Sequence, residues 1–231
     1  MLWPWSRLAA LGALMLSHAL VLYPTLRPAS QWLGPVITRF TTTRKEVWLT
    51  IDDGPESDTP QLLDLFDSRG VKATFFVKGS LASRYPDIIH DIAARGHSIG
   101  NHSQNHPSGT FWCLTPSRIA SEIDQCNRTL TELTGFSPTW FRAPVGMKNP
   151  AVHPLLDERG MRLIGWSSRG FDAVLRNPER IARSVLRDLE PGAIILLHQG
   201  QPHSIEILDR VITASQEQGY SFVIPSDEQL R

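Results

Sequence analysis

The stretch Leu49-Thr50-Ile51-Asp52-Asp53-Gly54-Pro55 joins an apolar segment to two adjacent carboxylates and a turn. Residues 47–51 are mostly apolar and partly β-branched, which predicts a buried strand, and Gly54-Pro55 predicts a turn after it. Two like charges at the end of a buried strand repel each other, and a nearby cation makes such a pair tolerable. We therefore expect Asp52 and Asp53 to share one pocket with different roles. The alternative is a strand exit whose acids face water.

The composition limits the classes of function. The 231 residues are enough for one large α/β domain, and 23 Lys plus Arg balance 23 Asp plus Glu. This balance disfavours polyanion binding, so no nucleic-acid partner is expected. The two cysteines, Cys113 and Cys126, lack the spacing of a zinc or redox motif. Cys126 is expected roughly 15 Å along a helix that begins near Pro116, which favours two free thiols.

The N-terminal segment differs in kind from the rest. Residues 8–23 are almost all apolar, and Ser17-His18-Ala19 offers a cleavage site of the secretory type. Three outcomes stay open: a signal peptide cut after Ala19, an uncleaved membrane anchor, or an apolar helix packed on the domain or the membrane surface. The segment predicts a membrane-associated, secreted or periplasmic protein. Residues 1–23 form this segment, and residues 24–45, which contain three prolines, form a non-helical connector.

Residues 46–231 alternate between strand-like and helix-like segments, which predicts βα units and a parallel sheet or barrel. After the first strand, the expected strands are residues 71–77, 97–102, 140–142, 162–166, 193–198 and 220–224. The expected helices are residues 59–68, with Thr59 as N-cap, and residues 86–96, 116–134, 151–160, 178–189 and 205–219.

His102-Ser103-Gln104-Asn105-His106 places two imidazoles four residues apart, a spacing that brings both rings to one face of a helical turn. Two imidazoles and one carboxylate form a catalytic site for a divalent metal, most often zinc. Asp53 is the expected third ligand, which leaves Asp52 as a free base. Alone, this histidine spacing also fits two surface histidines.

Two further strands end in residues that carry chemistry. Arg142 follows a short predicted strand and could brace the free carboxylate through a two-pronged pair, although an ordinary surface arginine is as easy to imagine. His198 ends the apolar run Ile194-Ile195-Leu196-Leu197 and is a candidate general acid, the alternative being a core histidine. Because active sites collect at the carboxyl ends of parallel strands, we expect these groups to converge.

These motifs resemble those of the polysaccharide deacetylases, the NodB-type domain of carbohydrate esterase family four. The resemblance covers residues 47–231 and is carried by Thr50-Ile51-Asp52-Asp53-Gly54-Pro55, His102-Ser103-Gln104-Asn105-His106, Arg142-Ala143-Pro144-Val145-Gly146 and Leu196-Leu197-His198. It implies a distorted (β/α)7-8 barrel and metal-dependent removal of an acyl group from a sugar. The implied roles are Asp52 as base, Asp53, His102 and His106 as metal ligands, Arg142 as partner of Asp52, and His198 as acid.

The chain departs from the family pattern at three positions. Val145 replaces a usual tyrosine but keeps the backbone N–H that an oxyanion needs. In the family's fourth motif only Trp166 and Asp172 match, and Arg169 stands where the first acid usually lies. A contact of Asp172 with His198 or Arg142 is the expectation that follows from this partial match. Gln199 follows His198 where many relatives carry aspartate, which could change how the imidazole is held.

The sequence thus predicts a hydrolase that removes an acetyl group from an N-acetylated sugar of a poly- or oligosaccharide, with Trp166 and Leu196 lining a pocket for the methyl group. One alternative is a deacylase of a lipid-linked or small-molecule sugar, which the apolar N-terminus and the residues around Val145 and Arg169 suggest. Another is an inactive glycan-binding module, which would have no use for a free base beside a metal. The pattern gives no sign of the oligomeric state.

Overall fold

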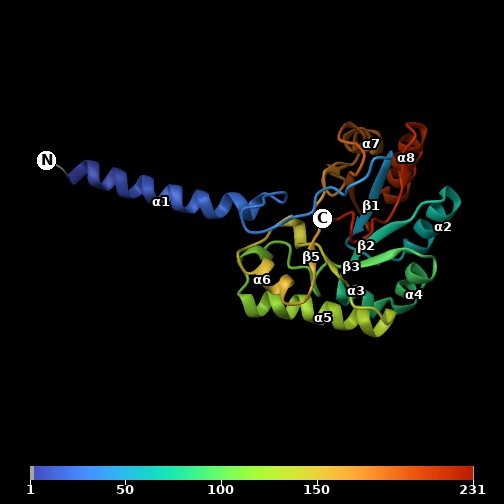
Figure 1. Ribbon diagram of the computed structural model, residues 1–231, viewed down its shortest axis with the longest axis horizontal. Coiled ribbons are helices and arrows are strands. Elements are labelled where there is room, and N and C mark those ends of the chain that lie inside the picture. The colour runs from blue at the N-terminus through green and yellow to red at the C-terminus, as the bar shows by residue number, and fades with distance from the viewer. Residues whose placement is uncertain (1–2, 231) are drawn as a thin grey trace.

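The computed structural model describes residues 3–230, and its centre is a curled parallel sheet (Figure 1). The strands in this part of the chain are β1 (Glu46–Asp52), β2 (Ala73–Val77), β3 (Ser98–Asn101), β4 (Trp140–Phe141), β5 (Arg162–Leu163), β6 (Ser168–Arg169), β7 (Ile194–His198) and β8 (Ser221–Phe222). Their order is β5-β4-β3-β2-β1-β7-β6, with β8 beside β1, and all paired strands are parallel. The α/β barrel-type fold is therefore confirmed.

The barrel is distorted because the sheet does not close on itself through its named strands. Instead, the connector crosses near the open side: Ile37 pairs with Ile164 directly after β5, and Arg39 pairs with Ala193 directly before β7. Val36 and Phe40 of this segment are buried. The connector is thus packed into the domain rather than hanging free.

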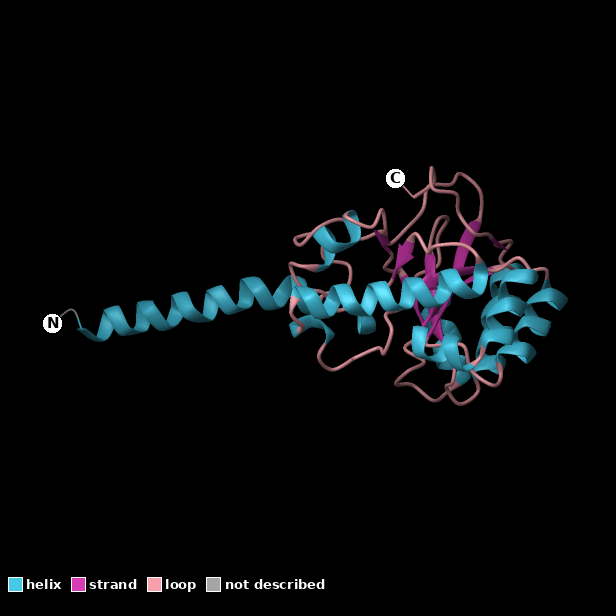
Figure 2. Cartoon of the chain, turned by 90° about the horizontal axis from the view of Figure 1, so that it is seen from below, coloured by secondary structure: helices cyan, strands magenta, loops and turns pink. Residues whose placement is uncertain are grey.

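Helices cover the sheet from outside. They are α2 (Thr59–Arg69), α3 (Gly79–Arg84), α4 (Pro86–Ala94), α5 (Pro116–Thr134), α6 (Val152–Asp157), α7 (Pro178–Arg187) and α8 (Ser204–Glu217), with short 3₁₀ turns at Phe111–Cys113 and Pro144–Gly146. The remaining helix of the described chain, α1 (Trp3–Leu26), does not cover the sheet. Figure 2 shows α5 lying across the sheet. Helix α7 packs on α8, and α3 packs on α5.

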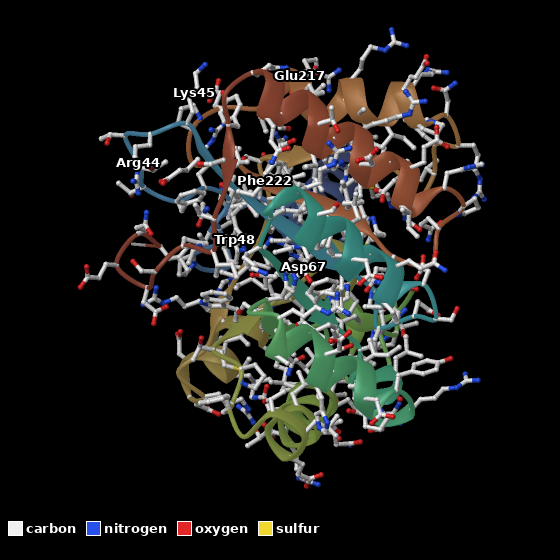
Figure 3. The ribbon with its side chains drawn as sticks, turned by 90° about the vertical axis from the view of Figure 1, so that its right-hand side faces the viewer. Arg44, Lys45, Trp48, Asp67, Glu217 and Phe222 are labelled. Carbon is white, nitrogen blue, oxygen red and sulfur yellow. The ribbon has the colours of Figure 1, made fainter. Side chains whose placement is uncertain are left out.

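Strand β1 decides which side chains enter the barrel, because successive residues of a strand point to opposite faces. Leu49 and Ile51 belong to the apolar cluster under α2 and α8, whereas Trp48 belongs to the cluster inside the barrel. Figure 3 shows Trp48 within the molecule and Arg44 at its edge. Thr50 and Asp52 share the face of Trp48, so the alternation carries Asp52 to the inner mouth of the barrel.

Helix α1 projects away from the domain (Figures 1 and 2). Its segment Ser6–Leu26 has a mean hydropathy of 1.6. This segment is long and apolar enough to cross a membrane, and it equally fits a signal sequence. Leu8 and Met15 are 62% and 67% exposed. The helix is therefore not packed on the domain, whereas a signal peptide, a membrane anchor and a helix on the membrane surface all stay open. It also continues through Pro24 to Leu26, so the prediction that the non-helical connector starts at residue 24 was wrong.

Several other local predictions were wrong. Thr59 lies inside α2 rather than capping it, and its hydroxyl accepts a hydrogen bond from the Glu56 N–H. Helix α3 was not predicted, because its six residues are too few for a periodic pattern. The single strand expected at 162–166 ends at Leu163, and the next strand, β6, lies at the opposite end of the strand order. Both cysteines are free, as predicted.

Candidate active site and metal centre

Asp53, His102 and His106 bring their ligand atoms within 4.8 Å of one another. Oδ1 of Asp53 lies 3.5 Å from Nε2 of His106 and 3.9 Å from Nε2 of His102. The predicted helical turn for the two histidines was wrong, because they lie in a loop after β3 where Ser103 and His106 have positive φ angles of 66° and 51°. The left-handed loop, and not helical periodicity, brings the rings to a centroid distance of 4.6 Å.

The three residues fit a divalent metal in their chemistry. Oδ1 of Asp53 is buried and accepts no hydrogen bond from residues 3–230, although the Lys78 ammonium lies 3.3 Å away, so this oxygen can still bind a metal ion. Burial lowers the pKa of His102, and burial together with His102 lowers the pKa of His106 to about 4, so both rings are neutral ligands at pH 7. Nδ1 of His102 lies 2.8 Å from the Arg142 carbonyl, which leaves Nε2 directed to the cluster.

Lys78 is a site residue that the sequence analysis missed. Its ammonium lies 3.3 Å from Oδ1 of Asp53. Burial opposes ionisation of Asp53, but the imidazoles of His102 and His106, when protonated at low pH, and the Lys78 ammonium outweigh burial and lower the pKa of this carboxyl. The available signal was the position of Lys78 directly after β2, the strand next to β1.

Asp52 is held by a buried arginine. Nη1 of Arg142 donates hydrogen bonds to Oδ1 of Asp52 at 2.7 Å and to the Thr50 hydroxyl at 2.7 Å. The expected two-pronged pair was wrong, because Nη2 and Nε donate to the carbonyls of Gly165 and Ile164 instead. The other carboxylate oxygen of Asp52, Oδ2, lies 3.6 Å from Nε2 of His102. Asp52 thus has one oxygen fixed by Arg142 and one that faces the three candidate metal ligands.

Arg142 is 1% exposed, so its charge depends on this partner. Burial lowers the pKa of the guanidinium, and the Asp52 charge acts in the opposite direction. The guanidinium carbon also lies 4.1 Å above the centre of the Phe76 ring, which adds a cation–π contact. Thr50 was missed as a partner, although its position two residues before Asp52 places both on one strand face.

His198 lies against Asp172. Nδ1 of His198 is 3.0 Å from Oδ1 of Asp172, and Oδ2 of the same carboxylate accepts a hydrogen bond of 2.7 Å from the His198 N–H. Burial acts to lower the pKa of His198, but the hydrogen bond and charge of Asp172 outweigh it and raise this pKa to about 9. The imidazole is therefore protonated at pH 7 and its other nitrogen, Nε2, can donate.

Gln199 does not hold the imidazole. Its side-chain amide donates to the Thr59 hydroxyl at 2.8 Å, and its backbone N–H donates to the Asp52 carbonyl at 3.0 Å. The Gln199 side chain also lies so close to Gly54 that a Cβ there would collide with it. Gln199 therefore supports the turn after Asp53, while Asp172 is the residue among 3–230 whose side chain hydrogen-bonds His198.

A cavity of about 210 Å³ lies above these groups. Besides the residues already described, its lining contains Val145, Gly146, Trp166, Arg169, Phe171 and Leu196. Val145 has a positive φ of 49°, which is strained for a β-branched residue. Its backbone N–H makes no hydrogen bond within residues 3–230, so this donor is free to serve a bound oxygen.

The family model of the polysaccharide deacetylases matches residues 39–164, which include the Asp52-Asp53 turn, the histidine loop and Arg142. The chain belongs to the polysaccharide deacetylase family. This match confirms the resemblance on which the predicted fold and metal site were partly based. It ends before Trp166, Arg169, Asp172 and His198, so it does not reach the part of the site in which the chain departs from the family pattern.

Three similar proteins illustrate the range within the family. The peptidoglycan-N-acetylglucosamine deacetylase PgdA of Listeria monocytogenes is 35% identical over 182 residues, which are 78% of this chain but 38% of that protein. The solved structure of the Bc1960 peptidoglycan N-acetylglucosamine deacetylase superposes with a TM-score of 0.76 at 31% identity, covering 80% of this chain and 88% of that one. A pseudoenzyme of carbohydrate esterase family four from Bacillus anthracis superposes equally well, with a TM-score of 0.76 at 30% identity. This match covers 85% of this chain and 69% of the pseudoenzyme chain.

Proposed function

We propose that the protein is a metal-dependent hydrolase that removes an acetyl group from an N-acetylated sugar of a poly- or oligosaccharide. The observation that carries this proposal is the position of Asp52, a carboxylate fixed by Arg142 and 3.6 Å from His102, one member of the metal cluster. A binding module needs no such base. A carboxylate base, Asp52, beside the three ligands Asp53, His102 and His106 is the arrangement expected for acyl hydrolysis.

Asp53, His102 and His106 would hold the divalent ion, which is most often Zn²⁺ where two imidazoles and one carboxylate are the ligands. When bound, the ion polarises the acyl carbonyl and acidifies a water molecule. Asp52 accepts the proton of the attacking water, and Arg142 keeps Asp52 in place. The free N–H of Val145 donates to the oxygen on which negative charge develops. His198, protonated and oriented by Asp172, donates its proton to the departing amine, while Trp166 and Leu196 enclose the acetyl methyl group.

The three parts of the chain have different roles under this proposal. Residues 46–231 form the catalytic domain, residues 24–45 connect it, and residues 1–23 serve as a signal or membrane anchor. The apolar, exposed surface of α1 supports the last assignment, because such a helix is costly to leave in water. The protein therefore works at the cell membrane or in a secreted or periplasmic location.

A second candidate function is deacylation of a lipid-linked sugar. Pro28 lies two residues after the end of α1, and a Cβ on Gly146 would be 2.7 Å from it and 2.6 Å from Trp166. Gly146 and Trp166 line the cavity, so the site opens close to the point where α1 leaves the domain. If α1 is inserted in a membrane, a sugar attached to a lipid is within reach of the site.

The test is acetate release by the zinc-loaded full chain, in mild detergent, from chitooligosaccharides and from a lipid-linked N-acetylated sugar. The Asp52→Asn variant should keep stoichiometric zinc and lose turnover by about 10²–10⁴-fold, the usual range for a general base. The His106→Ala variant should lose zinc itself. Turnover that survives in Asp52→Asn would contradict the mechanism, and zinc binding without acetate release from either substrate would favour an inactive glycan-binding module.

A further inference from the structure

Arg169 occupies a position that the proposed chemistry does not use. It lies on β6, where it pairs with Leu196 of β7, and Leu196 pairs with Thr50 of β1. Residues paired across neighbouring strands share a face of the sheet, so Arg169 stands on the inner face with Leu196 and Thr50. Its side chain lines the cavity above Asp52 and Asp53.

The guanidinium of Arg169 has no carboxylate within 4 Å among residues 3–230. Its contact is with Phe171, whose ring centre lies 3.8 Å from the guanidinium carbon. Phe171 has a positive φ of 58° and is 39% exposed, so the backbone turn keeps this ring at the mouth of the cavity. A ring stacked on the flat side of a guanidinium leaves the N–H donors along its edge free for a ligand.

The other charges of the site are already matched. Asp52 pairs with Arg142, Asp53 with Lys78, and Asp172 with His198. Arg169 is therefore a cation in excess, and a divalent ion at Asp53 would add further positive charge. Partial burial lowers the pKa of Arg169, yet the ordinary pKa of arginine is so high that the side chain stays charged. A neutral acetylated sugar would leave this charge without a partner.

A basic surface continues from the same ring. Phe171 also lines a second hollow of about 550 Å³, together with Leu175, Arg180, Arg183, Ser184 and Arg187. Its lining contains three arginines and no acid. Arg187 pairs with Asp188 at 3.2 Å, whereas Arg180 and Arg183 make no ion pair with the described residues. Two unpaired arginines of α7 thus lie near the mouth of the cavity, where they can attract negative charge on a bound molecule.

We infer that Arg169 recognises an anionic substituent, a carboxylate or a phosphate, on the acetylated saccharide, and that the arginines of α7 attract further negative charge along it. The inference rests on the proposed deacetylase function and narrows its substrate to acidic saccharides. Both anions accept hydrogen bonds from the edge of a guanidinium, which is the shared chemistry. Arg169 is then a specificity-determining residue that touches substrate, while Asp52 and His198 perform the hydrolysis.

The experiment compares three probes with the full zinc-loaded chain: neutral chitotetraose, a chitooligosaccharide carrying a carboxylate, and one carrying a phosphate ester. Binding is measured by calorimetry and turnover by acetate release. The anionic probes should bind about tenfold more tightly than the neutral one, and Arg169→Met should bring the ratio of anionic to neutral affinity close to one. The preference should also fall as salt is raised.

Arg118→Met is the matched control, because Arg118 is exposed on α5 and lines neither hollow. It should leave the preference unchanged, whereas Arg169→Lys should restore part of it. Equal binding of neutral and anionic probes by the unmodified protein, or an equal loss for all probes in Arg169→Met, would overturn the inference. Because calorimetry needs no turnover, it decides this question even if no acetate is released, a result that would instead contradict the proposed function. The carboxylate and phosphate probes separate the two sources of charge.

Discussion

The pairing of Asp52 with Arg142 should be the most sensitive electrostatic contact in the domain. Both side chains are almost fully buried, at 4% and 1% exposure, and their charged atoms are 2.7 Å apart. Removing one member of such a pair leaves the other charge in the interior without its partner, which costs about 3–5 kcal/mol. Asp52→Asn changes the charge and almost nothing of the shape. We therefore expect it to lower the free energy of unfolding by about 3 kcal/mol.

A double-mutant cycle isolates the pair. Arg142→Met should also destabilise, because it removes the donor to Asp52, Thr50 and the carbonyl of Gly165. In the variant that carries both changes no charge is left unpaired, so its loss should be smaller than the sum of the single losses by about 2–3 kcal/mol. The measurement is unfolding by urea in a detergent-containing buffer, monitored by tryptophan fluorescence. EDTA is added so that metal binding does not contribute to the stability.

Arg159→Met is the control. Arg159 makes two hydrogen bonds to Asp124, but these side chains are 20% and 45% exposed. Water and salt screen such a pair, so its loss should cost about 1 kcal/mol or less. If Asp52→Asn costs no more than this control, or if the two changes at Asp52 and Arg142 are additive, the interior pair does not carry the stability assigned to it here.

Three further outcomes are expected. Asp172→Asn should lower the pKa of His198 from about 9 and move the alkaline limb of the pH dependence of kcat/KM to lower pH, and a limb that does not move would contradict the role of Asp172. Because the pKa of His198 in the folded protein is above the ordinary 6.5, the stability that protonated His198 contributes is fully present below pH 6.5 and is lost as the pH rises through 9. Gly146→Ala would place a Cβ 2.6 Å from Trp166 at a φ of 72°, so acetate release should fall at least about tenfold with zinc content unchanged, and full activity would show that the turn tolerates the displacement. Lys148→Met should destabilise the junction after α1 by about 1–3 kcal/mol, because the buried ammonium donates to the carbonyls of Arg27 and Pro28, and hydrogen exchange of residues 25–30 should rise while that of α5 does not.

The sequence determined the elements on which the site is built and most of its chemical groups. Asp53, His102 and His106 were predictable because each follows the carboxyl end of a strand, and parallel strands present those ends at one edge of a sheet. The length and apolar character of α1 were likewise visible in the composition of residues 8–23. These features are local, since they depend on residues a few positions apart.

The tertiary structure decided which of these groups became neighbours. Strand register, which packing between distant segments sets, places Arg169 beside Leu196. The order of the strands and the loops after β4 and β6 bring Arg142 to Thr50 and Asp172 to His198. Single-residue spacing gave the wrong geometry for the two histidines, because left-handed backbone at Ser103 and His106 has no periodic pattern. Nor does any local signal reveal that Pro28, just beyond α1, packs on the turn at Gly146, because contacts between distant segments follow from the shape of the folded core.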